Sequence, residues 1–241
     1  MSWEKVLAVD DYRLFRSNIS LLEERVIQNF PDVYRNPGIL AAIRSVPRHL
    51  FVNAGYKFLA YTDNALPTYG GLTTSAPSVI GRMIAEVGVS RGDKVLEIGT
   101  GTGYEAAILA EMGAKVCTVE IDRFLAETAN RVLVLLGYKS GKGPQQARRG
   151  KPIRLYWGDG RQGLAEEAPF DGIIVAASIP DLRQVRHLAA QLSAAGGRMV
   201  VPVGDRLEQM LHIIERKGAR LAFRTLQSVS FQFLRLSGRD S

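Results

Sequence analysis

Residues 94–122, KVLEIGTGTGYEAAILAEMGAKVCTVEID, decide the fold. This stretch begins with a short apolar run, passes through a cluster of glycines into helix-forming residues, and ends in a second apolar run. The apolar runs predict strands at 94–98 and 115–121, and the segment between them predicts a helix at about 103–112. A strand–helix–strand unit of this kind is typical of an α/β fold with a parallel sheet.

The same alternation continues along the chain. Short, nearly all-apolar runs separated by helical patterns predict a doubly wound, mostly parallel sheet that is covered by helices on both faces. The further strands are expected at 153–157, 170–177 and 197–204, and the further helices at 122–136 and 182–193.

The C-terminal part departs from this alternation. Two long runs, at 209–216 and 219–236, have few turn signals between them. They predict an antiparallel strand pair that closes one edge of the sheet.

The first 90 residues have helical rather than strand periodicity. Residues 21–30 and 37–46 have helical spacing, and 75–88 predicts a helix with Ser75 as its N-cap. We therefore expect residues 1–75 to form a helical portion with a loop, packed on the core, and residues 76–241 to form the α/β domain.

Composition excludes several classes of protein. Hydrophobic residues make up 46% and charged residues 23% of the 241, as in soluble globular proteins. No apolar stretch approaches the roughly 18 residues of a membrane span, and no secretory signal is recognisable. The single cysteine, Cys117, excludes an intrachain disulfide, and the three histidines have no metal-ligand spacing. We expect a cytoplasmic protein without a metal.

The net charge of +7 raises the question of a nucleic-acid partner. Five cations without any acid lie in the segment 139–152, and the rest of the chain carries only +2. Glycine and proline mark this segment as a solvated insertion. We do not expect nucleic acid among the partners, and the sequence does not give the oligomeric state.

The glycine cluster predicts a ligand at the turn after the first strand. Gly99, Gly101 and Gly103 leave room for a ligand to approach the backbone ahead of a helix N-terminus. A dinucleotide fingerprint would have its third glycine at Tyr104, and the carboxylate of Glu97 would repel a diphosphate. The same carboxylate would attract a cationic ligand.

Two more acids lie at strand ends that should meet at the same edge of the sheet. Glu120 ends the next strand and is placed to accept hydrogen bonds from ribose hydroxyls, and Asp159 follows the third strand and could accept from an adenine amino group. Three acids without a phosphate cradle fit a ligand with adenine, ribose and a positively charged amino acid portion. We infer that the ligand is S-adenosylmethionine, whose demethylated product is S-adenosylhomocysteine.

From about residue 45 to about residue 204 the chain resembles the protein-L-isoaspartate (D-aspartate) O-methyltransferases. The glycine motif is shared with many methyltransferases, whereas GLTTSAP after AYTDNALP is far more specific to this family. The motifs that carry the resemblance are VPRHLFV (46–52), AYTDNALP (60–67), GLTTSAP (71–77), VLEIGTGTGYEAAILA (95–110), VEID (119–122), GDGRQG (158–163), APFDGIIV (168–175) and GGRMVVPVG (196–204).

The resemblance implies a fold, a reaction and a set of site residues. The fold is that of the S-adenosylmethionine-dependent methyltransferases, and the reaction methylates the side-chain carboxylate of isoaspartyl (and D-aspartyl) residues in damaged proteins, which initiates their repair. Ser75 would be catalytic, and Thr73, Thr74 and Asp63 would bind the substrate. The cofactor-binding positions would be Glu97, Gly99, Thr100, Gly101, Gly103, Glu120, Ile121, Asp159 and Gly160.

This chemistry needs little from the protein beyond alignment. A carboxylate has a reference pKa of about 4, so at neutral pH it is already an ionised nucleophile that needs neither a general base nor a metal. Alignment alone contributes up to about 7–11 kcal/mol in well-oriented reactions. Ser75 could orient one carboxylate oxygen while the other attacks.

The chain departs from the family pattern near the expected substrate side. Thr74 stands where the family usually has isoleucine, AASI (176–179) replaces an alanine-rich run, and FQFL (231–234) replaces FVPL. An alternative is therefore a related O-methyltransferase redirected to another carboxylate acceptor, a peptide or a small molecule. A third reading is a protein that binds the cofactor without catalysis, or that contacts nucleic acid through 139–152.

Overall fold

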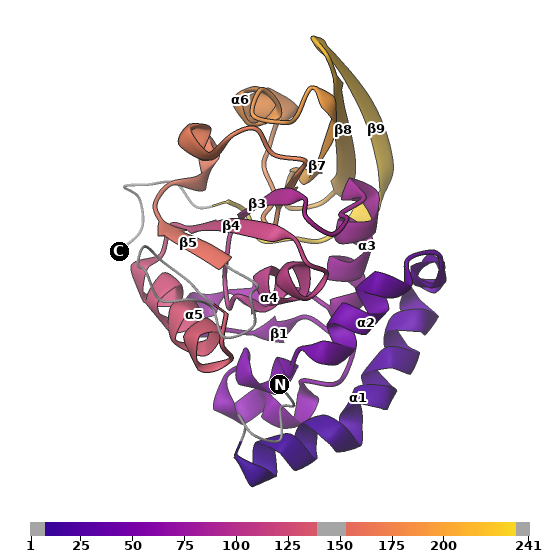
Figure 1. Ribbon diagram of the computed structural model, residues 1–241, viewed down its shortest axis with the longest axis vertical. Coiled ribbons are helices and arrows are strands. Elements are labelled where there is room, and N and C mark those ends of the chain that lie inside the picture. Colours follow the sequence, from indigo (N-terminus) through magenta and orange to yellow (C-terminus); the bar gives the residue numbers. More distant parts are fainter. Residues whose placement is uncertain (1–7, 139–152, 235–241) are drawn as a thin grey trace.

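The core of the protein is a seven-stranded sheet. The structure, a computed structural model, describes residues 8–138 and 153–234, and within them the strand order is β5-β4-β3-β6-β7-β8-β9 (Figure 1). The strands are β3 (Lys94–Ile98), β4 (Lys115–Glu120), β5 (Ile153–Trp157), β6 (Gly172–Val175), β7 (Ala195–Gly204), β8 (Gln209–Lys217) and β9 (Arg220–Val229).

The order in which the chain adds strands to the sheet reverses direction at β3, so a topological switch point lies beside this strand. From β3 the chain moves outward through β4 to β5, and it then returns to pair β6 with the other side of β3. All pairings from β5 to β7 are parallel, whereas β8 and β9 pair antiparallel. The doubly wound, mostly parallel sheet and the antiparallel C-terminal pair are therefore confirmed, and a ligand site is expected at the carboxyl end of β3.

Helices cover both faces of the sheet because its strands are apolar on both faces. Val95 belongs to a buried cluster that includes residues of the N-terminal helices, α3 and α4, whereas Leu96 belongs to a second cluster beneath the 182–192 segment. The α-helices are α1 (Val9–Asn29), α2 (Pro37–Ser45), α3 (Pro77–Val87), α4 (Tyr104–Glu111), α5 (Arg123–Leu135) and α6 (Arg186–Ala189).

Short elements connect this framework. The β-hairpin β1 (Leu66–Pro67) and β2 (Thr73–Thr74) is separate from the main sheet. The 3₁₀ helices are η2 (Pro31–Arg35), η3 (Arg48–Leu50), η4 (Ala54–Leu59), η5 (Tyr69–Gly71), η6 (Gly160–Gln162), η7 (Ala165–Glu167) and η8 (Leu182–Val185).

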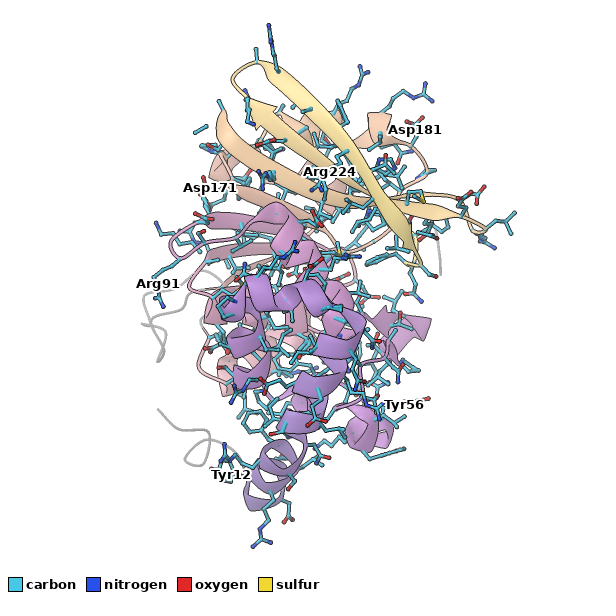
Figure 2. All side chains as sticks on the ribbon, turned by 90° about the vertical axis from the view of Figure 1, so that its right-hand side faces the viewer. Tyr12, Tyr56, Arg91, Asp171, Asp181 and Arg224 are labelled. Carbon is cyan, nitrogen blue, oxygen red and sulfur yellow. The ribbon has the colours of Figure 1, made fainter. Side chains whose placement is uncertain are left out.

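The N-terminal helices and the C-terminal hairpin lie at opposite ends of the molecule. The helices α1 and α2 lie together at one end, and the β8–β9 hairpin extends at the other (Figure 1). Arg224, on the outer strand, donates to Glu86 Oε2 of α3 at 2.6 Å and so ties the hairpin to the helical layer (Figure 2).

Two sequence-based expectations about helices were wrong. The helix expected at 182–193 consists of a 3₁₀ turn followed by the four-residue α6, because the chain must turn back to form β7. Ser75 is not the N-cap of α3; Ala76 holds that position without a side-chain cap bond. The Asp63 carboxylate, from a distant part of the chain, accepts the hydrogen bond from Ser78 N at 2.8 Å instead.

Three other observations bear on the expectations from composition. Within residues 8–138 and 153–234, no helix has the length and apolar character needed to cross a membrane. Cys117 is a buried free cysteine on β4. The basic segment 139–152 lies outside the described residues.

The N-terminal helices share the core of the sheet, and this arrangement can be tested with two adjacent leucines. Leu22 on α1 is fully buried, whereas Leu21 is 41% exposed. Leu22→Ala should lower the free energy of unfolding by about 2–5 kcal/mol, because it leaves a cavity in the core. Leu21→Ala should cost at most about 0.5 kcal/mol.

Urea unfolding followed by circular dichroism measures both changes. Similar small losses in the two variants would contradict a core that the helices and the sheet share.

Candidate active site

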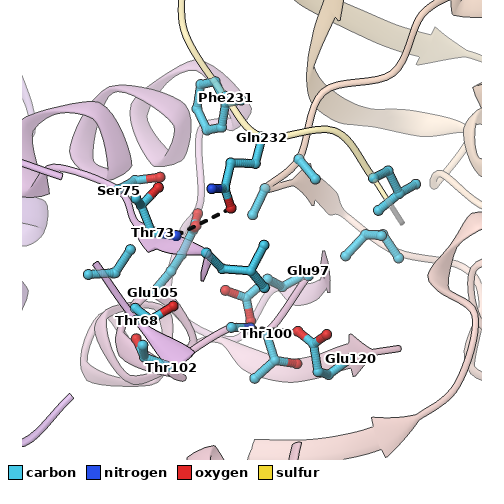
Figure 3. Close-up of a pocket in the computed structure, with 18 of the residues that line it drawn as sticks. Thr68, Thr73, Ser75, Glu97, Thr100, Thr102, Glu105, Glu120, Phe231 and Gln232 are labelled. Atoms are coloured by element: carbon cyan, nitrogen blue, oxygen red, sulfur yellow. Dashed lines mark hydrogen bonds between the residues drawn. The ribbon is translucent and has the colours of Figure 1, made fainter. Parts of the chain in front are cut away.

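A pocket of about 200 Å³ lies at the carboxyl ends of β3 and β4, next to the switch point. Figure 3 shows Thr73 and Ser75 on one side, Phe231 and Gln232 above them, and Glu97, Thr100 and Glu120 on the other side. The lining comes from six parts of the chain, namely 65–80, 97–105, 119–121, 159–160, 176–177 and 230–234.

The glycine loop needs glycine for its backbone conformation. Gly99 and Gly103 have φ angles of 95° and 86°, which side-chain-bearing residues rarely adopt. A Cβ at Gly103 would lie 3.3 Å from Leu133 Cδ1 on α5, so this glycine also permits close packing of α4 and α5. Gly103 therefore shapes the loop without lining the pocket, whereas Gly99, Thr100 and Gly101 line it.

Glu120 fixes the glycine loop from the end of the neighbouring strand. Its Oε2 accepts from Gly101 N at 2.8 Å and its Oε1 accepts from Asp122 N at 3.0 Å. Burial raises the pKa of this carboxyl, although the backbone donors oppose the shift. The remaining lone pairs of both oxygens are available to hydroxyl donors in the pocket, and Ile121 lines the pocket beside them.

Glu97 is fully buried at the end of β3. Its Oε2 accepts from the Thr118 hydroxyl at 2.5 Å, and Thr118 in turn lies 2.6 Å from the Thr100 hydroxyl. Its Oε1 has no hydrogen-bond partner among residues 8–138 and 153–234. Burial, and after it the proximity of Glu105, raises the pKa of Glu97 well above the usual value.

Glu105, in the first turn of α4, is a third buried acid in the pocket lining, after Glu120 and Glu97. It is 7% exposed, and its Oε1 also lacks a hydrogen-bond partner within the part of the chain that the structure describes. Burial raises the pKa of Glu105 to about 8.

Asp159 and Gly160 form the part of the lining that follows β5. Arg161 Nε donates to both oxygens of Asp159 at 3.0 Å, and the same carboxylate caps the 3₁₀ turn by accepting from Arg161 N. A Cβ at Gly160 would lie 2.6 Å from Ile98 Cγ2, so glycine is required there for the turn to approach β3.

The segment 73–75 forms the opposite wall. Thr73, Thr74 and Ser75 all line the pocket, and Ser75 is half-buried. Thr73 and Thr74 form strand β2, which pairs with β1, so the segment enters the pocket in a fixed, extended conformation.

Arg48 holds this wall in place from behind. It is fully buried, and its guanidinium donates to four backbone carbonyls at 2.8–3.1 Å. Its Cζ also lies 5.5 Å from the ring centroid of Tyr104, the first residue of α4. One side chain therefore connects the loop wall to the glycine-loop helix. The four acceptors are the carbonyl oxygens of Ala60, Thr62, Asn64 and Ser75.

Asp63, which the family resemblance placed among the substrate-binding residues, is not part of the pocket lining. It is 8% exposed and accepts from Asn29 Nδ2 at 2.7 Å as well as from Ser78 N. It therefore fixes the start of α3, directly after Ser75.

Gln232 covers the same wall from the C-terminal segment. Thr73 N donates to Gln232 Oε1 at 3.3 Å, and Gln232 Nε2 donates to Gly71 O at 3.1 Å. The segment 231–234 is itself held by main-chain bonds to Ser178, at 2.7 and 2.8 Å. The FQFL departure from the family pattern therefore lies at the pocket wall, beside the 71–73 backbone.

Sequence reasoning missed Arg48, Glu105 and Gln232. The signal for Glu105 was an acid in the otherwise apolar helix YEAAILA, where it would be expected to lie in the core. Arg48 and Gln232 carry no local signal, because their partners are backbone groups 12 to 27 and about 160 residues away.

The donor set fits a cationic ligand with polar hydroxyl groups. Two buried carboxyl oxygens, on Glu97 and Glu105, lack hydrogen-bond partners among the described residues, and leaving them so costs free energy. An ammonium group would supply the missing donors and the opposite charge. Within residues 8–138 and 153–234, no three metal-ligating side chains come together. These observations are compatible with S-adenosylmethionine.

Comparisons with known proteins agree with this description. The family model for protein-L-isoaspartate (D-aspartate) O-methyltransferases matches residues 21–239. A protein-L-isoaspartate O-methyltransferase of Chlorobaculum tepidum is 43% identical over 85% of this chain and 88% of its own. Protein-L-isoaspartate O-methyltransferase 2 of Geotalea uraniireducens is 38% identical over 92% of this chain and 96% of its own.

Solved structures show the same fold. A protein-L-isoaspartate O-methyltransferase is similar with a TM-score of 0.74 and 27% identity, over 88% of this chain and 65% of that longer chain. A structure from Plasmodium falciparum, in complex with S-adenosyl-L-homocysteine, has a TM-score of 0.69 and 19% identity over 90% of this chain and 98% of its own.

The buried Glu105 predicts a pH-dependent stability. Its pKa is about 8 in the folded protein and about 4.5 when unfolded, so between these values the folded state holds a proton that the unfolded state has lost. The stabilisation is therefore present below about pH 4.5 and is lost as the pH rises toward 8, by up to about 1.4 kcal/mol per pH unit. Glu105→Gln should be more stable, relative to the unsubstituted protein, at pH 8 than at pH 5.5.

Urea unfolding at the two pH values measures this difference. The exposed Glu166→Gln serves as the control and should show the same relative stability at both. A Glu105→Gln difference that does not change with pH would show that Glu105 is ionised throughout.

Proposed function

Because this chain belongs to the protein-L-isoaspartate (D-aspartate) O-methyltransferase family, we propose that its pocket transfers a methyl group from S-adenosylmethionine to the side-chain carboxylate of L-isoaspartyl and D-aspartyl residues. The methyl ester then cyclises to a succinimide, which reopens partly as normal aspartate and so initiates repair. Damaged proteins and peptides are the substrates. The observation that carries this proposal is one pocket with two buried carboxyls on one side, each with an oxygen that lacks a partner among the described residues, and the Thr73–Ser75 wall on the other.

The cofactor side is assigned to the glycine loop and the acids around it. Glu97 attracts the ammonium group, Glu120 accepts from the ribose hydroxyls, and Asp159 accepts from the adenine amino group. Gly103 acts through the shape of the loop. The cofactor-binding set is Glu97, Gly99, Thr100, Gly101, Gly103, Glu120, Ile121, Asp159 and Gly160.

The acceptor side is assigned to the wall that Arg48 holds. When bound, S-adenosylmethionine supplies an electrophilic methyl group on a positively charged sulfur. Ser75 donates a hydrogen bond to one oxygen of the acceptor carboxylate and leaves the other free to attack the methyl carbon. The carbon–sulfur bond breaks as the carbon–oxygen bond forms, and the sulfur keeps the electron pair.

The main contributions of the protein are orientation and exclusion of water. The acceptor carboxylate is ionised at neutral pH and needs no proton removed, so none of the site residues has to act as a general base. Thr73 and Thr74 line the path of the acceptor, and Asp63 acts indirectly, by fixing the start of α3 behind Ser75. A site that fixes the distance and angle of attack can supply about 7–11 kcal/mol.

A matched pair of peptides tests the reaction. The purified protein is incubated with labelled S-adenosylmethionine and either an isoaspartyl peptide or the same peptide with aspartate, and base-labile methyl ester is counted. Only the isoaspartyl peptide should be labelled. Ser75→Ala should lower kcat/KM by about 10–100-fold, since a hydrogen bond to a charged group contributes about 1.5–3 kcal/mol.

The exposed Ser90→Ala is the control and should retain full activity. Labelling of neither peptide, with cofactor binding intact, would mean that the acceptor is another carboxylate and that the departures at 74, 176–179 and 231–234 have changed the substrate. Equal activity of Ser75→Ala and the unsubstituted protein would remove Ser75 from the catalytic role.

A further inference from the structure

Two buried carboxyls of the pocket keep a free oxygen, where one would be enough to bind one ammonium group. Glu97 is fully buried and Glu105 is 7% exposed, and each has one oxygen without a hydrogen-bond partner among residues 8–138 and 153–234. They come from different elements, β3 and α4, on either side of the glycine loop. Glu105 has no place in the proposed function so far.

Neither acid forms an ion pair with any residue of 8–138 or 153–234. The buried guanidinium of Arg48 is directed to backbone carbonyls and the Tyr104 ring. Glu120, on β4, adds further negative charge near Glu97.

Uncharged polar and apolar groups of the described residues also face the pair. The Thr118 hydroxyl on β4 donates to Glu97, and the phenol of Tyr104 is itself buried, so burial raises the pKa of Tyr104 and keeps it neutral. The wall at 73–75 and the segment 231–234 contribute hydroxyl, amide and apolar groups. Two buried carboxyls in such surroundings cannot both be ionised at low cost.

We propose that Glu105 is a second ligand of the cofactor's ammonium group and that the Glu97–Glu105 pair releases a proton when this group binds. In the free protein the pair retains at least one proton at neutral pH, consistent with the directions of both pKa shifts. The ammonium supplies a positive charge, which drives the loss of one proton from the pair, and three donors, which can satisfy the two free oxygens. This inference rests on the proposed cofactor site.

An ammonium group fits these two acids better than a metal ion or an anion does. A divalent metal would need at least one more protein ligand, and the described residues offer no such cluster. The acceptor of the proposed reaction is an anion, and two carboxyls would repel it unless they were protonated or neutralised.

Isothermal titration calorimetry in two buffers measures the number of protons released on binding. Binding of S-adenosylhomocysteine, which carries the same ammonium group, is measured at pH 7 in phosphate and in Tris, two buffers with very different ionisation enthalpies. The dependence of the observed enthalpy on the buffer gives the number of protons exchanged. We expect release of a substantial fraction of a proton, up to about one, per molecule bound.

Two controls separate this effect from general binding. 5′-Methylthioadenosine has the adenosine but no amino acid portion, and it should bind without proton release. Glu105→Gln preserves the size of the side chain, so it should bind methylthioadenosine as the unsubstituted protein does. With S-adenosylhomocysteine it should release less than half as many protons. Glu166→Gln should release as many as the unsubstituted protein.

The outcomes distinguish the inference from the proposed function. Binding of S-adenosylhomocysteine without proton release, or equal release by Glu105→Gln and the unsubstituted protein, would overturn the role of Glu105 and leave the methyltransferase proposal intact. Failure of the unsubstituted protein to bind S-adenosylhomocysteine at all would overturn both.

Discussion

The guanidinium of Arg48 is the contact on which the geometry of the site depends. Its four bonds to main-chain carbonyls, of which the last is Ser75, fix the course of the loop from 60 to 75. Its position against Tyr104 connects the same loop to the start of the glycine-loop helix. Burial lowers the pKa of Arg48, yet a hydrogen bond from a charged donor contributes about 1.5–3 kcal/mol, so four of them can offset the cost of burying the charge. This one side chain therefore supports both the 60–75 loop and the start of the glycine-loop helix.

The acids on the opposite side of the pocket differ from one another in whether their oxygens have hydrogen-bond donors. Glu120 is satisfied by backbone donors and fixes the glycine loop, whereas Glu97 and Glu105 each keep a buried oxygen without a partner among the described residues. Such groups lower the stability of the free protein. In the proposed function a cationic ligand relieves that cost, so the feature that lowers the stability of the free protein would favour cofactor binding. Stability and affinity are therefore opposed at these two residues.

The sequence predicts the framework of the fold well and the supports of the site poorly. The strands from 94 to 204 are short apolar runs, so their existence and parallel pairing follow from local pattern. The acids at their ends come together because parallel strands end at one edge of the sheet.

The supports of the site depend on contacts between distant parts of the chain. The prediction of Ser75 as an N-cap was wrong because a distant side chain, Asp63, supplies the cap bond. The roles of Arg48 and Gln232 depend on backbone partners far away in the sequence, which no local pattern records. Glu105 could have been noticed as an acid within an apolar helix, but its lack of a partner is a property of the folded pocket.

Hydrogen–deuterium exchange in Arg48→Met tests the central role of Arg48 most directly. If Arg48 holds the loop, we expect faster exchange of the backbone amides in 60–75, while the strands at 94–98 and 115–120 keep the protection of the unsubstituted protein. Arg44→Met is the matched control, because Arg44 is exposed and pairs with Glu23 at the surface; its exchange should not change. Unchanged exchange in 60–75 of Arg48→Met, or an equal loss of protection over the loop and the strands, would contradict this role of Arg48.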